Sequence, residues 1–130
     1  MNQDVKCVSI QLSGTSIGEN VMYEQRIIAK QVKAFLDILI LAILNGTSMH
    51  GYKIVANIHK EFGILLSPAS IYPLLHSLEN KKLIEAYSNK GKTIYNVTSK
   101  GKENFRKKFT DYKLSIQIMT NFIKKHGETP

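Results

Sequence analysis

The chain has 130 residues, a length that suits one ordinary domain with extensions rather than two domains. Its 18 lysines and arginines against 10 aspartates and glutamates give a formal net charge of +8. Most of this excess lies between residues 81 and 108, where nine basic and two acidic side chains leave +7. Such a stretch attracts a polyanion, although a lysine-rich surface also keeps a protein soluble, and composition alone does not separate these readings.

Composition argues against several classes of protein. The single Cys7 cannot form an internal disulfide and lacks the partners of a zinc site, so we expect no metal and no cofactor. The apolar run over residues 34–44 contains Asp37 and is far shorter than the roughly 20 residues of a membrane helix. The first residues lack the charged-then-apolar order of a signal peptide, which predicts a cytoplasmic location.

The first half of the chain is expected to contain an extension and two helices. Residues 1–24 show no helical period and are expected to be mobile or to form a short appended strand. From about residue 26 to residue 44, apolar residues recur every 3.6 positions, which predicts a central buried helix ending at Asn45-Gly46. A second helix is expected to be capped by Ser48 and to stop at Gly63.

A third helix is predicted to begin at Ser67, a good N-cap, and Pro68, which suits the first helical position. One face is apolar, whereas the other carries hydroxyls, an imidazole and a ring but no charge before Glu79, and would fit a groove lined with base edges. The candidate DNA contacts on that face are Ser67, Ala69, Ser70, Tyr72, Pro73, His76 and Ser77. Tyr72 could instead fill the core, and His76 could simply face solvent.

Residues 83–88 and 93–98 are β-prone runs joined by residues 89–92, which predicts a hairpin. Three helices followed by a hairpin form a winged helix, a helix-turn-helix flanked by a β wing. Lys90 and Lys92 in the hairpin loop are candidate contacts to the DNA backbone, because an ammonium group acts on phosphate as a point charge and reads bases poorly.

The last predicted helix begins after Thr98 or Ser99 and carries apolar residues at alternating spacings of four and three, as in a coiled coil. This seam predicts a symmetric dimer that would present two reading helices to a duplex, although the seam could also pack on the 26–44 helix. Its residues are Phe105, Phe109, Tyr112, Ile116, Met119 and Ile123.

Three ordered motifs resemble the PadR-type transcriptional regulators. They are His-Gly-Tyr-x-Ile over residues 50–54, Leu-Ser-Pro-x-x-Ile-Tyr-Pro-Leu-Leu over residues 66–75 and Tyr-x-Val-Thr-x-x-Gly over residues 95–101. The resemblance implies a dimeric winged-helix repressor or activator, with small aromatic or amphipathic effectors in some members. The hairpin tip is shorter than the arginine-rich wing of many relatives. The chain also has no tryptophan, so it lacks an aromatic ligand sandwich that depends on tryptophan.

We therefore expect a mainly α protein with a small β hairpin: an extension over residues 1–24, a winged-helix DNA-binding domain over residues 25–100 and a C-terminal dimerisation helix over residues 101–126. The expected function is sequence-specific double-stranded DNA binding by a dimeric repressor. The alternative is a winged helix that serves as a protein-interaction or assembly module. An enzyme is not expected, because no phosphate-binding fingerprint is present and the histidines lack catalytic partners; His50 should make a structural hydrogen bond to backbone.

Overall fold

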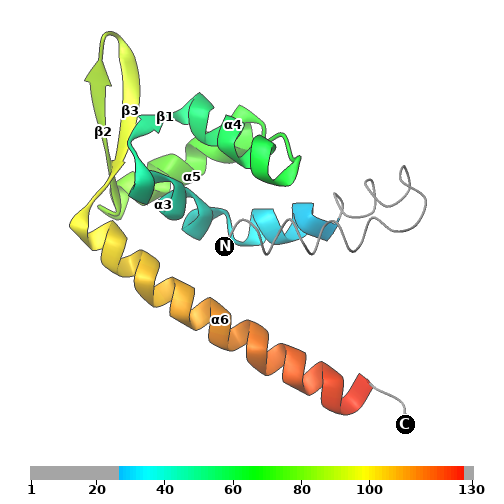
Figure 1. Ribbon diagram of the computed structural model, residues 1–130. Coiled ribbons are helices and arrows are strands. Elements are labelled where there is room, and N and C mark those ends of the chain that lie inside the picture. Colours follow the sequence, from blue (N-terminus) through cyan, green and yellow to red (C-terminus); the bar gives the residue numbers. More distant parts are fainter. Residues whose placement is uncertain (1–26, 128–130) are drawn as a thin grey trace.

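The computed structural model describes residues 27–127, so the extension expected over residues 1–24 lies outside the described residues (Figure 1). Residues 27–34 are helical, and α3 (Leu36–Gly46) follows after a single turn residue, Phe35. The prediction of one uninterrupted helix is therefore wrong at Phe35, where φ −107° and ψ 17° depart from helical values. The Phe35 ring packs there against Tyr112 of the last helix, with ring centroids 4.6 Å apart.

The second helix, α4 (Gly51–Phe62), begins later than a Ser48 cap would place it, and that prediction is wrong. Met49–His50 form a short strand, β1, and the Ser48 hydroxyl donates to Asn96 Oδ1 at 2.9 Å. The end of the helix agrees with the prediction, because Gly63 takes the left-handed conformation with φ 70°.

The third helix, α5 (Pro68–Asn80), has Ser67 at its N-cap and Pro68 at its start, as predicted. The Ser67 hydroxyl lies 3.1 Å from the Ser70 hydroxyl, so the two side chains hydrogen-bond to each other at the beginning of the helix. Pro73 lies inside α5 on its exposed face. A proline there leaves the carbonyl four residues earlier without its helical donor, which is tolerable where water reaches the backbone.

The predicted hairpin is confirmed as β2 (Ile84–Asn89) and β3 (Lys92–Val97). Its turn is tighter than the sequence suggested, because Asn89 pairs with Lys92 and only Lys90 and Gly91 remain in the loop. Both have positive φ, 53° and 78°, as a two-residue type I′ turn requires. β1 adds to the other edge of β3 and gives an antiparallel sheet of order β1-β3-β2. A strand of two residues is too short for a recognisable alternation, which is why the sequence did not reveal it.

The long helix α6 (Ser99–Gly127) leaves the base of the hairpin and runs away from the other elements (Figure 1). Thr98 caps it, since the Gly101 amide donates to Thr98 Oγ1 at 3.0 Å. Gly101 packs so closely that a Cβ there would overlap the carbonyl oxygen of Leu83. The start of α6 is therefore fixed to the segment that joins α5 to β2.

One apolar core lies between the sheet and helices α3, α4 and α5. Its largest fully buried side chains are Ile40, Leu41, Leu44, Ile54, Ile58, Ile71, Leu75, Leu78 and Ile84. No helix within residues 27–127 is long and apolar enough to cross a membrane. The mainly helical winged-helix fold with a long C-terminal helix agrees with the expectation from the sequence.

Candidate nucleic-acid interface

The face of α5 that points away from the core carries the residues that the sequence proposed for DNA contact. Ile71, Leu75 and Leu78 anchor the helix by its buried face. The opposite face is open to solvent, and all its candidates are exposed except Ser77, which is half-buried. These candidates are Ser67, Ala69, Ser70, Tyr72, Pro73, His76 and Ser77. The helix therefore presents hydroxyl, imidazole and phenol groups from a rigid base.

The sequence left open whether Tyr72 contacts DNA or fills the core. Its side chain is 45% exposed, so it does not fill the core. One side of its ring packs against the buried Gly51 at the start of α4, where a Cβ would lie 2.9 Å from the Tyr72 hydroxyl oxygen. Glycine at position 51 therefore lets the ring lie against the backbone of α4. This contact fixes the direction in which the phenol points.

A cavity of about 300 Å³ joins α5 to the start of α4 and to the hairpin. It is lined by His50, Gly51, Tyr52, Tyr72, Lys92, Thr93 and Tyr95. The three sequence motifs thus meet at one place in the fold. Burial, followed by the nearby Tyr72 and Glu79, raises the pKa of Tyr95 above its ordinary value, which favours the neutral phenol.

His50 makes a structural hydrogen bond in this cavity. Beside it lies Tyr52, which the sequence analysis did not name as a contact residue. His50 Nδ1 lies 3.1 Å from the Thr93 carbonyl oxygen, the structural hydrogen bond to backbone that was expected. The His50 ring stacks on Tyr52 with centroids 5.4 Å apart, and Lys92 Nζ lies 5.8 Å from the Tyr52 ring centroid. Tyr52 is 59% exposed beside these groups. The sequence did hold a signal for Tyr52, because it is an aromatic residue in the first turn of the helix before α5.

The two wing lysines occupy different places. Lys90 lies in the turn at the tip of the hairpin, whereas Lys92 lines the same cavity as Tyr72, and both are exposed. The structure thus brings one wing lysine close to the N-terminal half of α5 and places the other at the far end of the wing. Their cationic groups extend the exposed face of α5 toward the hairpin.

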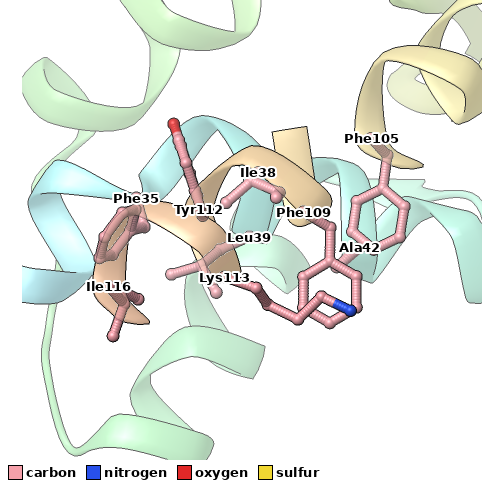
Figure 2. A pocket seen from close by; sticks show the side chains of 9 residues that line it. All are labelled: Phe35, Ile38, Leu39, Ala42, Phe105, Phe109, Tyr112, Lys113 and Ile116. Atoms are coloured by element: carbon pink, nitrogen blue, oxygen red, sulfur yellow. The ribbon is translucent and has the colours of Figure 1, made fainter. Parts of the chain in front are cut away.

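The proximal part of the α6 seam faces α3 of its own chain. Phe105, Phe109, Tyr112 and Ile116 line a cavity of about 320 Å³ whose opposite wall is Phe35 and α3, as Figure 2 shows. Beside it, Asp37 forms an ion pair with Lys108, accepts the amide of Ile38 at 2.8 Å and lies 3.5 Å from the Tyr112 hydroxyl. Phe105 and Tyr112 are half-buried there, whereas Phe109 and Ile116 remain 49% and 47% exposed, so this half of the seam packs on the first helix only in part.

The distal part of the seam is open. Met119 and Ile123 are 56% and 64% exposed. A second exposed apolar stripe, which sequence reasoning missed, runs along a different side of the same helix. It consists of Leu114, Ile118 and Phe122. Their spacing of four residues is visible in the sequence, but these residues lie outside the four-three seam from which the dimer was predicted.

Comparisons with known proteins show which family the chain resembles in sequence and in structure. Residues 40–107 match the model of the Transcriptional regulator PadR-like family. A PadR family transcription regulator from Clostridium difficile R20291 is 30% identical, with a TM-score of 0.61 over 68% of this chain and 98% of that chain. A PadR-like transcriptional regulator from Bacillus cereus is 27% identical, with a TM-score of 0.63 over 73% and 97%.

A PadR family regulator from Eggerthella lenta, 20% identical with a TM-score of 0.69, shares the fold over 81% of this chain and 92% of that chain. No protein of curated function matches the chain. The family model covers more than half of the chain and includes all three motifs. The chain belongs to the PadR-like family, whose members are DNA-binding transcriptional regulators and not enzymes.

Proposed function

We propose that this protein is a dimeric, sequence-specific repressor that occupies promoter DNA in the cytoplasm. The observation that carries the proposal is the exposed, uncharged, hydrogen-bonding face of α5 beside a wing that carries lysines. A helix of this kind enters the major groove, where base edges present distinct patterns of donors and acceptors. The division into a winged-helix domain over residues 25–100 and a dimerisation helix over residues 101–126 is part of the same proposal.

Tyr72 and Ser70 are the proposed base readers on α5. Tyr72 is held by Gly51, so its phenol points in a fixed direction, and Ser70 lies one turn from the helix start. His76 and Ser77 lie further along the helix and would extend the contact. Lys90 and Lys92 would neutralise phosphates, which fixes the position of the protein without reading sequence.

Dimerisation would bury the distal part of α6. A monomer leaves Met119, Ile123 and the Leu114, Ile118, Phe122 stripe in water, a large apolar surface on a single helix. A second copy would cover one of these sides, because two-fold pairing places identical apolar surfaces against each other. The dimer would also present two copies of α5 to successive half-sites on a duplex.

The cavity between α3 and α6 is the proposed place for an effector. Its walls are aromatic and aliphatic, and its volume of about 320 Å³ suits a small aromatic or amphipathic molecule. A molecule bound there would contact Phe35 and Phe109 together (Figure 2). It could therefore change the angle of α6 and with it the spacing of the two reading helices.

Selection of binding sites from random duplexes tests the reading function directly. We expect an enriched sequence with two half-sites about one helical turn apart, because a symmetric dimer repeats its contacts. Tyr72→Ala should reduce discrimination between this operator and random DNA by on the order of 1 kcal/mol or more. His59→Ala, on the exposed side of α4, is the matched control and should leave discrimination unchanged.

Two results would contradict the proposal. If no sequence is enriched and duplex binding does not depend on salt, the chain acts as a protein-interaction or assembly module. Equal losses on operator and random DNA in Tyr72→Ala would show that Tyr72 only positions the protein. Circular dichroism of the variant separates either outcome from unfolding.

A further inference from the structure

Two lysines adopt a backbone conformation that ordinarily favours glycine. Lys82 has φ 64° and Lys90 has φ 53°, and they are the non-glycine residues with positive φ within residues 27–127. A side chain raises the energy of this conformation, because its Cβ approaches the backbone carbonyl. Both residues are exposed. They bracket β2, since Lys82 lies two positions before Ile84 and Lys90 directly follows Asn89.

The conformation at Lys82 is imposed by its surroundings. The Lys82 amide donates to the Glu79 carbonyl at 2.9 Å and the Leu83 amide donates to the Leu78 carbonyl at 3.0 Å, a Schellman ending for α5. The Lys82 carbonyl in turn accepts the Thr98 hydroxyl at 2.6 Å. Two of these bonds use backbone atoms of residue 82 and the third joins its neighbour Leu83 to Leu78, so none of them needs a side chain at position 82 and glycine would allow them all.

The Lys82 side chain has no structural task that would account for it. Within residues 27–127, no ion pair or hydrogen bond involves its ammonium group. Leu83 packs in the core beside it, but Lys82 itself is exposed. A lysine in a conformation that favours glycine, with its ammonium group in solvent, leaves that charge available to a group outside the chain.

Positive charges slightly outnumber negative charges around Lys82. Lys81 precedes it, and the first turn of α6, which carries Lys100 and Lys102, is joined to it by Thr98 and packs against Leu83 through Gly101. We call this group of four the wing-base lysines. The nearest acidic residues in sequence are Glu79, Glu85 and Glu103, and Glu85 accepts a hydrogen bond from Asn96. The four wing-base lysines outnumber these three glutamates by one, so the wing base carries a small net positive charge.

We infer that Lys82 binds a phosphate of the duplex, so that the wing grips the DNA backbone at its base as well as at its tip. The inference rests on the proposed DNA-binding function. Six strand residues at about 3.4 Å each separate Lys82 and Lys90 by roughly 20 Å. Two lysines that far apart would neutralise different phosphates and contribute separately to the salt dependence of binding.

The experiment compares Lys82→Gly, Lys82→Gln and Lys82→Arg in the full chain with a fluorescent duplex over a range of salt. Lys82→Gly should raise the melting temperature by a few degrees, because the strain is relieved. Both uncharged variants should lower affinity about five- to tenfold near 0.1 M salt and reduce the slope of log K against log salt by about 0.9. Lys82→Arg should keep the wild-type slope.

Lys60→Gln is the matched control. Lys60 is an exposed lysine in the last turn of α4, at the end of the helix that points away from the hairpin (Figure 1). Its loss should leave the salt slope unchanged. If Lys82→Gly and Lys82→Gln both keep wild-type affinity and slope, the inference is overturned and Lys82 is merely tolerated. Wild-type protein without salt-dependent duplex binding would instead overturn the proposed function itself.

Discussion

Helices α4 and α6 use the same apolar spacing and give opposite results. In α4, Ile54 and Ile58 are four residues apart and are both 0% exposed. In α6, Ile118 and Phe122 have the same spacing and are 58% and 64% exposed. Spacing therefore shows which face of a helix is apolar, but not which surface covers that face.

The difference comes from what each helix can reach. α4 is twelve residues long and lies against α3, α5 and the sheet. α6 has 29 residues, about 44 Å of helix, and only its first part meets α3 and the hairpin. The body of the winged helix buries its apolar side chains within residues 27–127, whereas no other described residue covers the distal half of α6.

The largest expected effect separates the two helices by their stability. Ile54→Ala should lower the free energy of unfolding by about 2–5 kcal/mol, because it leaves a cavity in a closed core. Ile118→Ala should change it by less than about 0.5 kcal/mol at concentrations where the protein is monomeric. Denaturant titration measures both. Equal losses in dilute protein would mean that Ile118 is already buried in a single chain.

The second effect concerns the distal half of α6 alone. Ending the chain after Gln117 keeps Phe105, Phe109 and Tyr112 on α3 and removes Ile118 and Phe122 with the rest of the helix. We expect a folded monomer whose operator affinity is lower by a factor of at least about 100, since a single half-site contact loses the effective concentration of a linked second site. Sedimentation and fluorescence anisotropy measure the two quantities. A shortened chain that remains dimeric would place the interface elsewhere.

The sequence predicted best where local chemistry decides the structure. Pro68, Gly63 and Thr98 mark helix ends through their own backbone preferences, and the structure agrees at all three. It predicted less where distant segments meet. Ser48 is a good cap by type, yet pairing of β1 with β3 directs it to Asn96 instead.

The site shows the same limit. The exposed face of α5 follows from helical periodicity, so its residues could be named from the sequence. The cavity that unites Tyr52, Tyr72 and Tyr95 depends on three segments spread over more than 40 positions, and the contact between Gly51 and Tyr72 depends on packing that no local pattern records.

The smallest effect tests the junction between the two regions. Burial raises the pKa of Tyr112, the Asp37 carboxylate raises it further, and Lys108 opposes this change. A raised pKa in the folded state favours the neutral phenol, so its contribution to stability is complete below pH 10 and is lost as the pH rises through the folded value. The free energy of unfolding of the wild type should therefore fall more steeply above pH 10 than that of Tyr112→Phe.

The comparison with Tyr112→Phe isolates this group, because all other ionisable side chains, Tyr95 included, are common to both proteins. Denaturant titrations at pH 9, 10 and 11 would measure the difference. A difference that does not change with pH would mean that the Tyr112 phenol is solvated equally in the folded and unfolded chains. The proximal half of α6 would then be as detached from α3 as the distal half, and the boundary between the closed core and the exposed part of α6 would move back toward Gly101.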